Sequence, residues 1–189
     1  LKVGEAIGGV DPDQINRLII SRTIKEHLDK ELTFNTNEQP IKVLSLFFID
    51  SVKHYRQYDE EGNPFSGKYA LMFEEEYREL AKSNDYRKLF EGIDLDDDVS
   101  EVHNGYFSTD KKIVSPFETQ ALKKSSTKEA VETSAYNLIM KDKEKLLSFD
   151  TKLKFIFSHS ALKEGWDNPN VFQICTLRDM GSERERRQT

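Results

Sequence analysis

Three short runs of apolar residues are the most regular hydrophobic feature of the chain. They cover residues 43–49, 155–157 and 171–176 and are rich in the branched and aromatic residues that favour strands. Runs of this length with almost no polar alternation are typical of strands that are buried on both faces of a parallel sheet. Because helical patterns separate them, the sequence predicts an α/β domain with a mainly parallel sheet and helices on both faces.

A long helix is predicted before the first of these strands. Asp11 can cap a helix whose first position is Pro12, and Gln14 can reach back toward the cap. The polar residues 35–40 end the helical pattern. The apolar residues that recur at helical spacing and form one stripe are Ile15, Leu18, Ile19, Ile24, Leu28 and Leu32.

The region between the first two strands is harder to interpret. Residues 56–101 carry acidic runs and are predicted to be an insertion on the outside of the domain, with one helix over 71–89. Another helix is expected over 51–58, directly after the first strand. A short strand and turn are predicted over 102–107, and a long helical pattern covers 128–147.

Composition narrows the class of protein. The 189 residues suffice for one domain with a core, and the net charge of −6 argues against a uniformly basic nucleic-acid surface without excluding a local one. The single cysteine, Cys175, lies in an apolar run and is predicted to be a buried thiol, which fits a reducing cytoplasm. No apolar run reaches the length of a membrane span.

Candidate chemistry is concentrated between the last two strands. Ser158, His159 and Ser160 directly follow the run 155–157, and residues 164–169 read Glu-Gly-Trp-Asp-Asn-Pro. Ligands of parallel sheets bind at the carboxyl ends of strands, and small hydroxyl residues at a helix start can bind a phosphate. The alternative explanation is an ordinary strand–helix–strand crossover that ends in a Gly-Asp-Pro turn.

A family resemblance follows from these segments. Residues 153–177 resemble motif V of superfamily 2 helicases and translocases, most closely the helicase-like subunit of type III restriction enzymes. Residues 42–50 resemble motif IV, residues 102–108 resemble the turn that grips the nucleic-acid backbone, and residues 184–188 resemble the approach to motif VI. The resemblance implies a single second RecA-like domain over 1–189, with three layers, which is part of a longer parent subunit.

The resemblance also implies roles for individual residues. The nucleotide side of motifs V and VI would comprise Gly165, Trp166, Asp167 and Gln188. The nucleic-acid side would comprise Phe48, Asp50, His103, Asn104, Gly105, Ser158, His159 and Ser160. Asp167 is suited to accept a hydrogen bond from a ribose hydroxyl. No catalytic residue and no metal ligand is expected in this chain, because it carries neither a phosphate-loop lysine nor a magnesium-binding acidic motif.

Cofactors and partners are implied for the parent subunit. They are ATP and Mg²⁺, double-stranded DNA, the first RecA-like domain of the same subunit and the methylation subunit that recognises the sequence. The parent would be a bacterial cytoplasmic, ATP-dependent type III endonuclease with no membrane partner, and the chain alone would be inactive and hold no cofactor. Two alternatives stay open: another superfamily 2 DNA or RNA helicase, and a non-enzymatic α/β interaction module.

One motif is a false match. Residues 62–69, Gly-Asn-Pro-Phe-Ser-Gly-Lys-Tyr, nearly fit a phosphate-binding loop, but Tyr69 stands where Ser or Thr would ligate magnesium. No buried strand precedes the segment, and the acidic residues 59–61 would repel phosphates. The segment is therefore predicted to be a turn.

Overall fold

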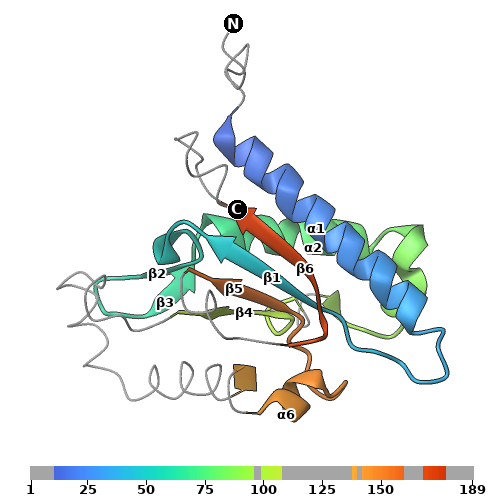
Figure 1. Cartoon of the computed structure of the whole chain (residues 1–189). Helices are drawn as coiled ribbons and strands as arrows, with labels where there is room; N and C mark the ends of the chain where they lie inside the picture. Colours follow the sequence, from blue (N-terminus) through green and yellow to red (C-terminus); the bar gives the residue numbers. More distant parts are fainter. Residues whose placement is uncertain (1–10, 96–98, 108–137, 140–141, 160–167, 178–189) are drawn as a thin grey trace, which may run out of the picture.

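The described strands form one parallel sheet and one separate hairpin. The computed structural model describes residues 11–95, 99–107, 138–139, 142–159 and 168–177. Within them the sheet order is β4-β5-β1-β6, and β2 pairs with β3 in an antiparallel hairpin (Figure 1). The principal elements are α1 (Pro12–Phe34), β1 (Leu44–Ile49), β2 (Arg56–Tyr58), β3 (Pro64–Ser66), α2 (Lys68–Ala81), β4 (His103–Tyr106), α6 (Lys143–Leu147), β5 (Phe155–Ser158) and β6 (Val171–Leu177).

All neighbours in the larger sheet run parallel. β1 pairs with β5 on one side and with β6 on the other, and β4 pairs with β5 at the far edge. The three apolar runs therefore form parallel strands as predicted. The α/β arrangement, with a mainly parallel sheet and flanking helices, is consistent with a RecA-like domain.

The register defines two edges of this sheet. At the carboxyl edge Phe48 of β1 lies opposite Ser158 of β5, which lies opposite Tyr106 of β4. At the amino edge three residues are aligned in the same way: Ser45, Phe155 and His103. The two edges are three residues apart along each strand, or roughly 10 Å.

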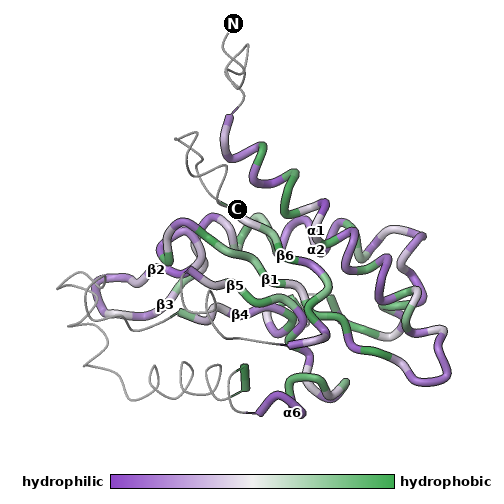
Figure 2. Tube along the Cα trace, viewed as in Figure 1, coloured by the Kyte–Doolittle hydropathy of each residue, from purple (hydrophilic) through white to green (hydrophobic). Residues whose placement is uncertain are grey.

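Each face of the sheet is covered by its own hydrophobic cluster. The larger cluster packs α1 and α2 against one face, and the smaller one packs α6 against the other (Figure 1). The central strand β1 runs almost entirely through hydrophobic colour in Figure 2, whereas α1 alternates between polar and apolar positions. The prediction of helices on both faces is confirmed.

Helix α1 begins as predicted, but its apolar stripe is not fully buried. The Asp11 side chain accepts a hydrogen bond from the Asp13 backbone N–H at 3.0 Å, with Pro12 at the first helical position. Ile24 and Leu28 are fully buried, whereas Ile15 and Leu18 remain 45% and 70% exposed. These two residues lie on the amino-terminal part of α1, which extends beyond the sheet (Figure 1).

The region after β1 differs most from the prediction. Residues 51–58 do not form a helix: a single 3-10 turn over Val52–His54 leads directly into β2. The predicted helix over 71–89 is present as α2, which ends at Ala81 and is followed by a 3-10 helix over Asn84–Leu89.

Helix α2 lies in the core rather than on the outside. Tyr69, Phe73 and Tyr77 are fully buried in the cluster that covers the α1 face of the sheet. The expectation that residues 56–101 lie outside the domain is therefore wrong for this helix. That the region is an insertion relative to other RecA-like domains stays a prediction.

Several smaller expectations can be placed. The His103-Asn104-Gly105 segment forms strand β4 itself and not a turn. Only the start of the false phosphate loop is a hairpin turn, with Gly62 at φ 84° in the left-handed region that favours glycine. The rest of the segment forms β3 and the first residues of α2. Cys175 is a buried thiol as predicted, and burial raises its pKa to about 11. In the described part of the predicted 128–147 helix, α6 starts separately, behind a cap at Asp142.

Helices in the described part of the chain are too short or too polar to cross a membrane.

Candidate nucleic-acid interface

The carboxyl edge brings together four of the predicted nucleic-acid-binding residues. Phe48 and Ser158 are neighbours across β1 and β5, and Asp50 and His159 follow directly at the two strand ends. The Asp50 backbone N–H donates to the Leu177 carbonyl at 3.1 Å, which fixes the end of β1 against β6. Parallel sheets commonly bind ligands at this edge.

These four residues differ in how far they are buried. Phe48, Asp50 and His159 are partly exposed, whereas the Ser158 side chain is fully buried. The Ser158 hydroxyl has no hydrogen-bond partner among the residues that the structure describes. Of these four residues, Phe48, Asp50 and His159 are accessible at the edge.

A histidine that the sequence did not single out also belongs to this edge. The His54 Nδ1 lies 2.7 Å from the Asp50 Oδ1, and both side chains are about one quarter exposed. His54 comes from the 3-10 turn that replaces the predicted helix, four residues after Asp50. The i,i+4 spacing was visible in the sequence, but it could be interpreted only with knowledge of the turn.

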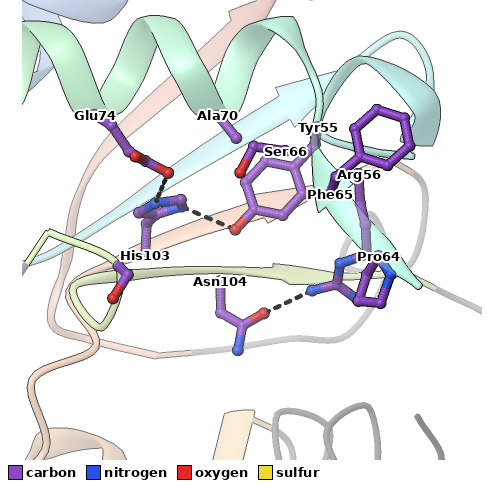
Figure 3. A pocket seen from close by; sticks show the side chains of 10 residues that line it. Tyr55, Arg56, Pro64, Phe65, Ser66, Ala70, Glu74, His103 and Asn104 are labelled. Atoms are coloured by element: carbon purple, nitrogen blue, oxygen red, sulfur yellow. Dashed lines mark hydrogen bonds and ion pairs between the residues drawn. The ribbon is translucent and has the colours of Figure 1, made fainter. Parts of the chain in front are cut away.

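The other predicted nucleic-acid residues lie elsewhere, on β4. His103 is buried on the α2 side of the sheet at the amino edge, so it does not join Ser158 and His159. Its Nδ1 lies 2.9 Å from the Tyr55 hydroxyl and its Nε2 lies 3.6 Å from Glu74 Oε1 (Figure 3). His103 is therefore held from both sides by side chains of other elements.

The two groups that contact His103 both have shifted pKa values. The hydrogen bond with the His103 imidazole lowers the pKa of Glu74 and outweighs burial, which would raise it. Arg78, at 3.4 Å, lowers the pKa of Glu74 further. Burial raises the pKa of Tyr55, so its hydroxyl stays neutral. The Tyr55 hydroxyl and the Glu74 carboxylate therefore lie against the two different ring nitrogens of His103.

Asn104 and Gly105 are the next two residues of β4, and each has contacts of its own. The Asn104 Oδ1 accepts from Arg56 Nη2 at 3.0 Å and from the Gly105 backbone N–H at 2.7 Å. A Cβ atom on Gly105 would overlap the Phe107 ring and lie 2.7 Å from the Tyr55 ring. Close packing between these rings thus accounts for a glycine in the middle of a strand.

A pocket of about 220 Å³ opens beside β4. It lies between the β2–β3 hairpin, α2 and β4, and both Tyr55 and the Arg56–Asn104 pair line its walls (Figure 3). The residues that line it are Tyr55, Arg56, Pro64, Phe65, Ser66, Ala70, Glu74, Ser100, His103 and Asn104. The described residues of the predicted nucleic-acid set therefore lie in two separate places, the carboxyl edge of the sheet and strand β4 beside this pocket.

A buried polar network at the amino edge was not predicted. His27 of α1 is fully buried, with its Nδ1 2.8 Å from the Ser45 hydroxyl and its Nε2 3.5 Å from Glu31 Oε1. Ser45 donates onward to Gln173 Oε1 at 2.8 Å, and Lys154 lies 2.9 Å from Glu31. The network joins α1 to β1, β5 and β6.

The titration of this network follows from its enclosure. Burial lowers the pKa of His27, which outweighs the opposing effect of Glu31. Burial alone would raise the pKa of Glu31, but the contacts with His27 and Lys154 outweigh it and lower the pKa to about 2. At neutral pH the network therefore holds a neutral imidazole beside a Glu31–Lys154 ion pair.

The remaining predicted site residues lie outside the described part of the chain. They are Ser160, Gly165, Trp166, Asp167 and Gln188. Within the described residues no group of three His, Cys, Asp or Glu side chains is arranged to hold a metal ion.

Sequence comparison finds relatives in the family that the sequence resembles. No protein-family model matches the chain. The chain is 40% identical to the Res subunit of the type III restriction-modification enzyme EcoPI of Escherichia phage P1, over 96% of its length. It is 39% identical to the EcoP15I Res subunit of Escherichia coli over 96%, and 36% identical to the StyLTI Res subunit of Salmonella typhimurium over 88%.

The similarity covers nearly all of this chain but little of each relative. The chain spans 18% of the length of each of these Res subunits. The predicted resemblance to the Res subunits of type III restriction-modification enzymes is confirmed, and the chain corresponds to one segment of such a subunit.

Proposed function

We propose that this chain is the second RecA-like domain of the DNA-translocating motor in a type III restriction endonuclease. The observation that carries the proposal is the similarity to three Res subunits over 88–96% of the chain. It favours restriction over the two alternatives, another superfamily 2 helicase and an interaction module. The parent subunit would be an ATP-dependent endonuclease in the bacterial cytoplasm.

The carboxyl edge of the sheet is the proposed DNA contact. His159 and His54 can donate hydrogen bonds to phosphate oxygens, and the exposed part of Phe48 can contact a sugar or base. Asp50 is a poor direct phosphate contact because it is anionic. Its hydrogen bond to His54 at 2.7 Å instead makes it a positioning residue for that imidazole.

ATP would bind on the side formed by Gly165, Trp166, Asp167 and Gln188. In this proposal ATP and Mg²⁺ lie in the cleft between this domain and the first RecA-like domain of the same subunit, and the methylation subunit recognises the DNA sequence. The chain alone lacks the phosphate loop that supplies most contacts to the transferred phosphate, so it is expected not to hydrolyse ATP.

The test uses the parent subunit and measures ATP turnover with and without DNA. Replacing His159 and Ser160 by Ala should weaken the stimulation by DNA, because each lost charge-assisted contact costs about 1–3 kcal/mol. Asp167→Ala should lower ATP turnover under both conditions. Asn37→Ala is the matched control, since this exposed residue lies in the turn that leads to the opposite edge of the sheet.

The outcomes separate the alternatives. Loss of DNA stimulation in the His159/Ser160 variant, with normal melting and an unaffected Asn37→Ala control, supports the motor. Normal DNA-stimulated turnover in both site variants would reduce motif V to a structural crossover. A parent protein without any DNA-dependent ATP turnover would favour the interaction module.

A further inference from the structure

We propose that Lys53 is a further phosphate contact for duplex DNA, and that Gly67 and Tyr69 are positioning residues that hold it in place. This inference rests on the proposed function, because it presumes that duplex DNA passes the carboxyl edge of the sheet. Lys53 lies in the 3-10 turn Val52–His54, which follows the carboxyl end of β1. It adds an ammonium group to an edge whose other proposed contacts are histidines and a phenylalanine.

The Lys53 ammonium has no anionic partner among the residues that the structure describes. The residue is exposed and takes part in no ion pair within this part of the chain. Two other cations, on α2 and α1, are already neutralised: Lys68 lies 2.6 Å from Asp13, and Arg17 lies 2.6 Å from Glu75. A lysine without an anionic neighbour keeps its full attraction for a phosphate, and counterions are released when the two meet.

The turn that carries Lys53 has little support of its own. It is three residues long, and the His54 N–H donates to the Ser51 carbonyl at 3.1 Å. The Tyr55 N–H donates to the Val52 carbonyl at 3.0 Å. A single helical turn is unstable in isolation, because few hydrogen bonds compensate for the ordering of its residues. The position of the turn therefore depends on the groups that pack against it.

Gly67 holds the backbone of the turn. Its N–H donates to the Tyr55 carbonyl at 2.8 Å. A Cβ atom on Gly67 would lie 2.6 Å from backbone atoms of both Lys53 and His54. The φ of Gly67 is −82°, which any residue can adopt, so the close approach of the two backbones is what requires a glycine here.

Tyr69 holds the same turn through the His54 side chain. The Tyr69 side chain is buried, and its ring meets the His54 imidazole edge-on, with the ring centroids 5.2 Å apart. The buried Asn16 of α1 donates from its Nδ2 to the Tyr69 hydroxyl at 3.4 Å. Asp50 contacts the imidazole at Nδ1, 2.7 Å away. His54 is therefore held between the end of β1 and the first turn of α2, which restrains the neighbouring Lys53.

The false phosphate loop thereby receives a structural explanation. Its second glycine, Gly67, packs against the turn, and Tyr69, which stands where a magnesium ligand would be, packs against His54. Lys68 between them pairs with Asp13 and lies over the Tyr69 ring, 5.3 Å from its centroid. The segment contributes to phosphate binding indirectly, because it positions a lysine of another element.

The first experiment measures how salt affects the binding of duplex DNA to the parent subunit. Fluorescence anisotropy of a labelled duplex, without ATP, gives the association constant at several salt concentrations. Lys53→Ala should weaken binding and make the slope of log K against log [salt] less steep by about 0.9, the value for one phosphate contact. Lys53→Arg should keep the slope. Lys82→Ala is the matched control, because Lys82 is an exposed lysine at the opposite end of α2.

A second experiment tests the positioning residues. Tyr69→Leu removes the ring that meets His54, so it should flatten the salt slope as Lys53→Ala does. Tyr69→Phe keeps the ring and should keep the slope. Combining Tyr69→Leu with Lys53→Ala should flatten the slope no further, since both changes act through one contact. Gly67→Ala, whose Cβ would displace the turn, should behave like Tyr69→Leu, and thermal melting of each variant measures its stability separately.

The outcomes distinguish the contact, the positioning and the motor. A flatter slope for Lys53→Ala, with Lys82→Ala equal to the unsubstituted subunit, supports the contact. Equal slopes for the two lysine variants overturn it and leave the proposed motor intact. If Tyr69→Leu melts earlier but keeps the steep slope, the positioning role is overturned and Tyr69 is only structural. A parent subunit that binds no duplex DNA overturns the contact together with the motor.

Discussion

Two buried histidines of this domain have the same set of partners in different surroundings. At each histidine Nδ1 faces a hydroxyl group at 2.8 or 2.9 Å, and Nε2 faces a glutamate at 3.5 or 3.6 Å. The first set is His27, Ser45 and Glu31, and the second set is His103, Tyr55 and Glu74.

The two sets differ in what lies beside them. The first is sealed between α1 and the sheet, and Lys154 neutralises its carboxylate at 2.9 Å. The second forms the wall of a pocket that also presents Arg56 and Asn104. A histidine with a hydroxyl and a carboxylate therefore does not by itself indicate a binding site; the open volume beside it does.

The largest effect is expected from breaking the sealed set. Glu31→Ala removes one member of a buried ion pair and leaves Lys154 without its main partner, which should lower the free energy of unfolding of the chain by about 3 kcal/mol. Glu101→Ala is the matched control, because the Glu101–Lys152 pair is exposed and worth about 0–1 kcal/mol. Urea unfolding of the two variants measures the difference, and equal stabilities would show that enclosure is irrelevant.

Acid should destabilise the chain mainly through the sealed set. Glu31 has a pKa of about 2 in the fold against an ordinary 4.5, so the unfolded chain binds the proton first. Its stabilising contribution is complete above pH 4.5 and is lost as the pH falls toward 2. His27 acts in the same direction from pH 6.5 downward, because burial lowers its pKa.

Urea unfolding at several pH values measures this loss. Between pH 7 and about pH 3, Glu31 should account for about 2 kcal/mol of the decrease in the free energy of unfolding. Lys154 and Lys30, which face His27, disfavour its protonation further. In Glu31→Gln the part of the decrease below pH 4.5 should shrink, and an unchanged acid limb would assign the pH dependence to other carboxylates.

A matched pair of hydroxyl deletions compares the two sets directly. Ser45→Ala removes hydrogen bonds to both His27 and Gln173, so it should cost about 2 kcal/mol. Tyr55→Phe removes one hydrogen bond, to His103, and should cost about 1 kcal/mol. Thermal unfolding ranks them, and a larger loss for Tyr55→Phe would mean that the pocket wall, not the sealed set, limits stability.

The sequence predicted the frame of this fold better than its sites. Continuous apolar runs identified the parallel strands, because strands buried on both faces carry few polar residues. Helix α2 was predicted, but not its burial, because the acidic run 74–76 interrupts the buried residues Tyr69, Phe73 and Tyr77. The four-residue spacing of these three aromatic residues places them on one face of the helix, and the acidic run made that face difficult to recognise.

The site could be predicted only where it follows from strand ends. The neighbourhood of Phe48 and Ser158 follows from parallel pairing, so that part of the edge was foreseeable. The partners of His103 are 48 residues away at Tyr55 and on α2 at Glu74, and no local pattern brings them together. The sequence therefore could not predict that His103 is buried in a strand beside a pocket.

The smallest stability effect is expected at the carboxyl edge. Asp50 and His54 form a partly exposed i,i+4 pair with side chains 24% and 26% exposed, so Asp50→Asn should change the free energy of unfolding by less than about 0.5 kcal/mol. In the parent subunit, however, the same variant should weaken DNA-stimulated ATP turnover, because a positioning residue for His54 loses its charge. Asp85→Asn, at an exposed position on the 3-10 helix after α2, controls for the loss of one acidic charge. A variant that loses stability instead of DNA stimulation would make Asp50 a structural residue like those of the sealed set, and Asp50 would then have no part in the proposed DNA contact.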